Sequence, residues 1–201
     1  MRLTFLLAFL VFGIYVRGQS ALSDTLIHLN NYTVHYSQQF KQPLEVWYKV
    51  KCPKDMTKRD SCITSETWTR PSGIVLPTND VFSSQWHHGH LASVESFDCT
   101  CEDAESTMNM LNCAMQNASL NKGMWLRLEN QERKRALEAN EVSVYVKLEF
   151  NDNIDVEGVR IPSGFFKTLT VDGVAETYYF PNQIPTSENL EDYRINGYGR
   201  K

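Results

Sequence analysis

The segment that most constrains the fold of this chain is residues 120–139, which combines two stripes at helical spacing. The apolar stripe can face a core and consists of Leu120, Met124 and Leu128. The second stripe recurs every four residues and consists of Asn121, Trp125, Glu129 and Arg133. It is either a solvated face with a Glu129–Arg133 ion pair or part of a functional site. Gly123 costs a helix interior roughly 1 kcal/mol relative to alanine, and such a glycine often marks close approach by another backbone or a ligand.

Strand-like segments precede and follow this predicted helix. Residues 32–37, 44–52, 141–150, 159–171 and 175–182 are rich in β-branched and aromatic residues. The first half of 102–116 has a helical pattern, and 51–80 is polar with three prolines, which predicts mostly loop. Strands, then helices, then strands predict an α+β domain, with a central, mostly antiparallel sheet flanked by helices.

The N-terminus predicts a secretory signal peptide. After Arg2 comes an apolar run of about 14 residues, and Gly18 is a small residue suited to signal-peptidase cleavage. A membrane anchor is the alternative, but a spanning helix needs roughly 20 apolar residues. We therefore expect a signal peptide at 1–18, a single secreted domain at 19–201 and no membrane association, because no second hydrophobic span follows.

Two sequons and five cysteines agree with an extracellular protein. The sequons begin at Asn31 and Asn117. An odd number of cysteines allows at most two internal disulfides, and we expect Cys52 to pair with Cys62, and Cys113 with Cys99 or Cys101. The C-x-C pair near histidines also suggests zinc, but its spacing matches no common structural zinc pattern.

The charge of the chain gives no general attraction for nucleic acid. Without Arg2 and Arg17, the basic residues fall from 20 to 18 against 24 acidic residues, so the mature formal charge is −6. Proteins that bind phosphates by releasing counterions usually have a basic face. Any attraction must therefore be local, and a bound divalent cation is one source of it.

Three of the five histidines, His87, His88 and His90, lie within four positions. Histidine serves equally as a base, a metal ligand or an ordinary hydrogen-bonding residue. If the segment is a strand, alternation places His88 and His90 on one face and His87 on the other. Two imidazoles on one face together with Asn121 could hold a transition metal, so a non-catalytic metal-binding module is one alternative.

The order of the motifs "HGHLA", "NCAMQ" and "LNKGMWLRLENQER" resembles the DNA/RNA non-specific endonuclease family. That family has a ββα-metal core, in which an Asp-Arg-Gly-His motif is followed by an asparagine-bearing helix. The early strand region and the late "RIPSGFFKTL" and "YYFPN" segments are also similar, so the resemblance covers most of the mature chain. It implies a secreted nuclease that acts on DNA and RNA, and nothing in the sequence points to a protein partner.

The resemblance also implies roles for individual residues. His90 is similar to the general base, and Asn121 to the protein ligand of one Mg2+ ion, for which Mn2+ is a possible substitute. Glu129 would hold water around the ion, and Arg133 would support Glu129 or contact phosphate. Asn112 and Gln116 match residues that line the family's site. A neutral imidazole can accept a proton from water, and one amide oxygen suits a hard, mostly hydrated cation.

The chain departs from the family at the residues that would contact phosphate. His87 and His88 stand where the family has aspartate and arginine, so a permanent cation is replaced by a titrating one. Alignment of Trp68 with the family's tryptophan places Glu66 at a second arginine position. These departures keep a second interpretation open: a catalytically degenerate module that binds nucleic acid or a transition metal without cleaving.

Overall fold

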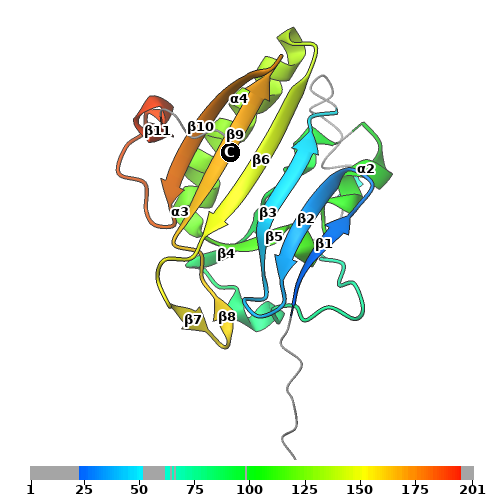
Figure 1. Ribbon diagram of the computed structural model, residues 1–201, viewed down its shortest axis with the longest axis vertical. Coiled ribbons are helices and arrows are strands. Elements are labelled where there is room, and N and C mark those ends of the chain that lie inside the picture. Colours follow the sequence, from blue (N-terminus) through cyan, green and yellow to red (C-terminus); the bar gives the residue numbers. More distant parts are fainter. Residues whose placement is uncertain (1–22, 52–61, 64, 66, 98, 196–201) are drawn as a thin grey trace, which may run out of the picture.

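The computed structural model describes residues 23–51, 62, 63, 65, 67–97 and 99–195 (Figure 1). The predicted signal peptide, Cys52 and Glu66 lie outside these residues. Within the described part of the chain, no helix is long and apolar enough to cross a membrane.

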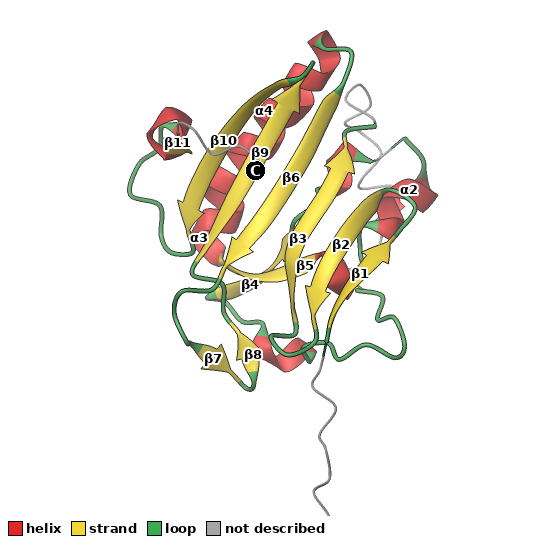
Figure 2. Ribbon diagram, in the orientation of Figure 1, coloured by secondary structure: helices red, strands yellow, loops and turns green. Residues whose placement is uncertain are grey.

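Seven strands of the described residues form one antiparallel sheet, in the order β1-β2-β3-β6-β9-β10-β11 (Figure 2). Their bounds are β1 Asp24–His28, β2 Tyr32–Ser37, β3 Gln42–Lys49, β6 Val142–Glu149, β9 Gly164–Val171, β10 Val174–Pro181 and β11 Arg194–Ile195. The pairing of β3 with β6 joins the early and the late strands. The α+β class and the antiparallel sheet are thus confirmed, while β1 and β11 were not predicted.

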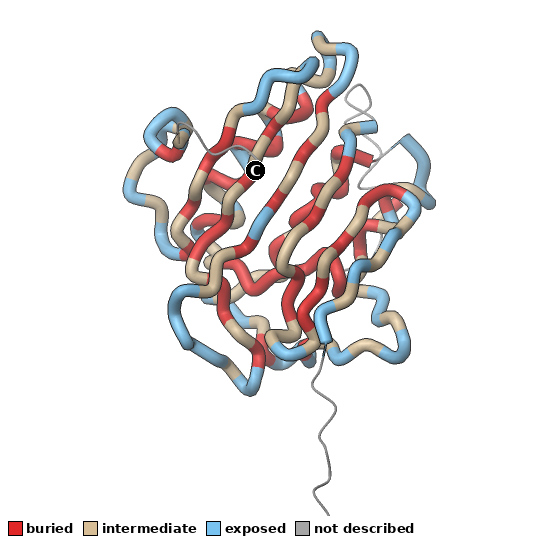
Figure 3. Tube along the Cα trace, in the orientation of Figure 1, coloured by how far each residue is buried: buried red, intermediate tan, exposed pale blue. Residues whose placement is uncertain are grey.

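One face of the sheet carries the main core. Along β6 the residues at alternate positions are buried, and they are Val142, Val144, Val146 and Leu148. Helix α4, Leu126–Glu138, crosses this face behind β6, β9 and β10 (Figures 1 and 3). Leu120, Met124 and Leu128 belong to the same buried cluster, so the apolar stripe faces the sheet as the sequence predicts.

The helical segment begins and ends near its predicted limits, but it is interrupted. A short helix α3, Ala118–Leu120, continues into a π-helical turn at Asn121–Trp125, and α4 follows directly. Gly123 has non-helical angles, with φ −105° and ψ −105°. A Cβ atom at this position would meet nothing within 4 Å, so no other described part of the chain approaches it closely. Glycine instead permits a local change of backbone direction at the start of the polar stripe.

The remaining elements are short. Strands β4 (Trp86–His90) and β5 (Cys113–Asn117) form a two-stranded ribbon, and β7 (Asp155–Val156) pairs with β8 (Val159–Arg160). The segment 102–116 contains helix α2 at Cys101–Ser106, a 3-10 turn at Met110–Asn112 and the beginning of β5. Its first half is therefore helical, as expected.

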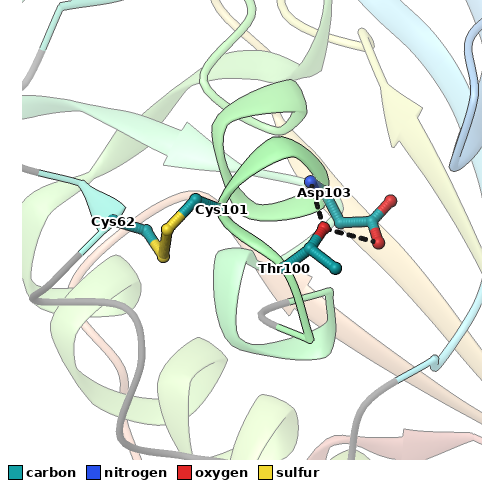
Figure 4. Close-up of a disulfide and its surroundings, with 4 residues drawn as sticks. All are labelled: Cys62, Thr100, Cys101 and Asp103. Atoms are coloured by element: carbon teal, nitrogen blue, oxygen red, sulfur yellow. Dashed lines mark hydrogen bonds between the residues drawn. A yellow bond between two sulfur atoms is a disulfide. The ribbon is translucent and has the colours of Figure 1, made fainter.

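The predicted disulfide pairings are wrong. Cys62 pairs with Cys101 at the start of α2, with their Cα atoms 4.9 Å apart (Figure 4). Cys99 also lies in a disulfide, and Cys113 is free and buried on β5. The short sequence separation between Cys52 and Cys62 favoured a local loop, but the fold brings α2 against residue 62. Thr100 begins α2 by accepting a hydrogen bond from the Asp103 amide at 3.1 Å.

Candidate active site

A hollow of about 530 Å³ collects most of the predicted site residues. Its lining comes from β4, the π-helical turn, α4 and the loops before and after β4, and consists of Ile63, Trp68, His87, His88, His90, Ser93, Val94, Glu95, Met108, Asn121, Lys122, Leu126 and Glu129. A larger hollow of about 620 Å³ lies along β2, β3, β6, β9 and β10. None of the described residues that line this larger hollow is a histidine or a carboxylate, so the smaller hollow is the better candidate for acid–base chemistry.

His90 lies at the end of β4, and three contacts surround it. Its Nε2 atom is 3.3 Å from the Sδ atom of Met108, and its ring lies 4.4 Å from that of Trp68. The indole Nε1 of Trp125 donates a hydrogen bond to the His90 carbonyl at 3.1 Å. The second stripe of the helix therefore holds the backbone of the candidate base in place.

His88 and His87 differ in their surroundings. The His88 ring lies between the rings of Phe82, at 3.7 Å, and Trp68, at 5.2 Å. His88 and His90 both lie against Trp68, as strand alternation predicts. The Nδ1 atom of His87 lies 3.4 Å from the amide nitrogen of Asn121. This contact uses the Asn121 nitrogen and leaves its carbonyl oxygen for another ligand.

Glu129 lies at the wall of the hollow on the first turn of α4, and only 7% of it is exposed. Burial raises the pKa of its carboxyl to about 7, and the charges of Glu132 and Glu95 act in the same direction. Lys167 and Arg133 act against this rise. Glu129 therefore changes charge near neutral pH.

Arg133 lies behind the hollow and does not line it. Its side chain is 3% exposed, and its guanidinium donates to Ser93 Oγ at 3.3 Å and to Asn130 Oδ1. Its ion pair is with Glu95, at 4.0 Å. Arg133 therefore does not form the simple ion pair with Glu129 that helical spacing suggested. Its burial also keeps the guanidinium away from the surface where phosphate would bind. Burial places the guanidinium where it supports the loop that follows β4.

Asn112 and Gln116 are also fully buried, beneath the hollow. The Asn112 amide accepts a hydrogen bond from the Ala92 backbone at 2.8 Å and donates to the carbonyl oxygens of Ala92, at 2.8 Å, and Thr107. Gln116 packs under Gly89, where an added Cβ would lie 2.6 Å from the Cβ of Gln116. The structure thus places both residues under β4 and the loop after it, not in the lining where the sequence predicted them.

Several lining residues were not predicted. Ser93 and Glu95 follow β4, and Met108 follows α2, positions that carry no periodic or motif signal. Trp68 was identified only as an alignment point, and Lys122 was not singled out. Their roles depend on loops brought together by the fold, which sequence spacing does not reveal.

The residues at the hollow include oxygen donors that suit a mostly hydrated cation. Among the described residues, no group of three or more histidine, cysteine, aspartate or glutamate side chains is arranged to hold a metal ion. The side chains of Asn121 and Glu129 both reach the hollow. A neutral amide oxygen with nearby anionic support suits Mg2+, which usually retains several water molecules.

The fold has a known counterpart. It resembles a solved structure of the EndoG/EndoGI complex, described with the mechanism of EndoG inhibition, with a TM-score of 0.72 and 18% sequence identity. The match covers 86% of this chain and 80% of that chain. No curated protein matches the sequence.

The family follows from the sequence itself. Residues 14–198 match the DNA/RNA non-specific endonuclease family, and the chain belongs to this family. Its members are nucleases that act on nucleic acids and generally depend on a divalent metal. The resemblance seen in the motifs is thereby confirmed.

Proposed function

We propose that this protein is a secreted endonuclease that hydrolyses phosphodiester bonds of both DNA and RNA at the hollow between β4 and α4. His90 acts as the general base, Asn121 holds one Mg2+ ion, and Mn2+ is a possible substitute. The observation that carries the proposal is that His90, Asn121 and Glu129, which come from three separate elements, line one hollow. The match of the whole domain to a nuclease family supports the reaction class.

Each residue has a task that agrees with its position. The imidazole of His90 takes a proton from the attacking water, while Trp125 fixes the backbone beside it. The carbonyl oxygen of Asn121 holds the ion, and the Glu129 carboxylate accepts hydrogen bonds from water around it. When bound, Mg2+ neutralises phosphate charge and stabilises the departing 3' oxygen.

The positive charge of the site itself is small. Of the described residues that line the hollow, Lys122 alone is a lysine or an arginine, and Arg133 is buried behind the lining. His88, held between Phe82 and Trp68, adds positive charge only when it is protonated. The metal ion is therefore expected to supply most of the attraction for phosphate, and binding is expected to depend only weakly on monovalent salt, because few lysine or arginine side chains contact phosphate.

A plasmid-nicking assay tests this function directly. The wild type should nick plasmid with Mg2+ or Mn2+ and should be inactive in EDTA. His90→Ala should lower the rate by about 10²–10⁴-fold, because general-base catalysis contributes about that factor. His35→Ala is the matched control, since His35 lies on β2 and pairs with Glu45 at 3.4 Å. Binding of nucleic acid without cleavage by the wild type would favour the degenerate module.

Secretion makes a separate prediction about the two sequons. Asn31 is 8% exposed, and its amide nitrogen donates to Asp103 Oδ1 at 2.8 Å and Ser106 Oγ at 2.9 Å. Asn117 is half-buried and uses its oxygen, not its nitrogen, to accept from the amides of Ser119 and Leu120. A glycan on the nitrogen is therefore compatible with the fold at Asn117 and not at Asn31. Glycopeptide mass spectrometry of protein secreted by eukaryotic cells should find a glycan at Asn117 alone, and a glycan at Asn31 in folded protein would contradict this assignment.

A further inference from the structure

A fully buried ion pair lies between the sheet and α4. The Nζ atom of Lys167, on β9, is 2.9 Å from Oε2 of Glu132, on α4, and both side chains are 0% exposed. Glu132 also accepts hydrogen bonds from Tyr48 Oη at 3.0 Å and from Ser96 Oγ at 2.8 Å. The carboxylate is therefore held from β3, from β9 and from the loop that follows β4.

Such a pair is not explained by stability alone. Replacing a buried ion pair by apolar residues of similar volume often leaves stability unchanged or raises it, because burying two charges is costly. The core on this face of the sheet includes the apolar and aromatic residues Trp125, Phe165 and Leu169. A lysine at this position therefore calls for a role beyond packing.

The surroundings of Lys167 connect it to the hollow in two ways. Its ammonium lies 4.7 Å from the ring centroid of Trp125, the residue that donates to the His90 carbonyl. Glu129 lies three residues before Glu132, so the two carboxylates are neighbours on α4. The Lys167 ammonium thus pairs with Glu132, lies over the ring of Trp125 and adds positive charge near Glu129.

The charges that face Glu129 come from each element packed around it. Glu132 and Arg133 lie on α4, Glu95 on the loop after β4, and Lys167 on β9. With Glu129 itself, three carboxylates face two cations. Among these charges, that of Lys167 acts most strongly to lower the Glu129 pKa, against the larger effect of burial. Without the Lys167 ammonium, the Glu129 carboxylate would face the carboxylates of Glu132 and Glu95 and only one cation, Arg133.

We propose that Lys167 is a positioning residue of the active site. Its buried ammonium holds Glu132 by direct contact, lies over the ring of Trp125, which in turn holds the His90 backbone, and places a positive charge beside Glu132, one helical turn from Glu129. Lys167 lies on a strand remote from every motif of the site. This role rests on the proposed nuclease function for its effect on catalysis, but not for its effect on Glu129.

The test uses opposite expectations for the two members of the pair. Lys167→Met removes a cation near Glu129, so the acidic limb of the kcat/KM profile should move to higher pH by about one unit or more. Glu132→Gln removes a neighbouring anion, so the same limb should move to lower pH. If the Lys167–Glu132 pair had only a structural role, losing either partner would move the acidic limb in the same direction. Shifts of equal sign, or no shift in either variant, would overturn the proposal.

Two further variants guard against misfolding. The double variant Lys167→Met/Glu132→Gln removes both charges and keeps a polar group that can bond to Tyr48 and Ser96, so it should remain folded while the acidic limb still moves upward, because Lys167 has the larger effect on Glu129. Lys147→Met, on the exposed side of neighbouring β6, is the matched control and should leave the profile unchanged. If the double variant has the wild-type pH profile, Lys167 has no role at the site beyond packing.

A direct titration separates this proposal from the function. The carboxyl carbon of Glu129 can be followed by ¹³C NMR against pH in the wild type, the double variant and Glu132→Gln. Its midpoint should rise in the double variant and fall in Glu132→Gln, whether or not the protein cleaves nucleic acid. Unchanged midpoints would reject the role of Lys167 even in an active nuclease. An inactive wild type with shifted midpoints would instead reject the nuclease function alone.

Discussion

The two sides of the candidate active site differ in how they are held. On the α4 side, Glu129 is backed by buried charged residues that contact the sheet, so its place depends on the core. On the β4 side, His87 and His88 are half-buried on a two-stranded ribbon, and His88 is held by aromatic rings. The helix side keeps the motif of the family, and the strand side departs from it. Changing a residue that the core holds disturbs many contacts, whereas the ribbon can exchange an arginine for an imidazole at smaller cost.

After His90→Ala, the largest effect is expected from the helix side. Asn121→Ala removes the proposed protein ligand of the ion, so the Mg2+ concentration for half-maximal activity should rise by about 10–100-fold, as for other losses around metal sites. A nicking assay across a Mg2+ titration measures this change. Asn151→Ala, on an exposed loop, is the control. A titration curve that coincides with the wild type would show that Asn121 is only a helix residue.

A smaller effect of opposite sign is expected from the strand side. An imidazole at position 88 helps bind phosphate only when protonated, while His90 and Glu129 act only when deprotonated, so the wild type should have a narrow, bell-shaped pH profile near neutral pH. His88→Arg should raise activity by about tenfold and remove the alkaline limb, because a guanidinium stays charged, stacks on aromatic rings and binds phosphate through two donors.

The control for this variant is His28→Arg on exposed β1, which adds the same charge away from the hollow. Absence of metal-dependent cleavage from about pH 5 to 8 in the wild type, together with no rescue by His88→Arg, would leave the degenerate module as the better account of the chain.

The smallest effect concerns stability on the helix side. The folded pKa of Glu129 is raised to about 7 from 4.5, so its contribution to stability is full below about pH 4.5 and is lost as the pH rises through 7. Glu129→Gln should therefore match the wild type at pH 5 and be more stable at pH 8 by ~1–3 kcal/mol. Urea unfolding at both pH values measures this, with exposed Glu138→Gln as the control. If the variant differs from the wild type in unfolding free energy by the same amount at both pH values, burial does not destabilise the charged form of Glu129.

Local periodicity was sufficient to predict the main elements. Alternating β-branched residues predicted β2, β3, β6, β9 and β10, and the four-residue spacing predicted the helix from which Asn121 and Glu129 reach the hollow. These patterns are readable because burial of one face forces a period of two in strands and of 3.6 in helices. The family motifs then indicated which polar residues to examine, and His87, His88, His90, Asn121 and Glu129 do meet at one hollow.

Only the tertiary structure decided which side chains stand behind that hollow. The burial of Asn112, Gln116 and Arg133, the Cys62–Cys101 disulfide and the place of Lys167 all depend on elements distant in sequence. Spacing along the chain does not encode such contacts, because burial depends on which faces of separate elements pack together. The same holds for charge: Glu129 has a high pKa because the fold removes water and places Glu132 and Glu95 near it, and these effects outweigh the opposite effects of Lys167 and Arg133.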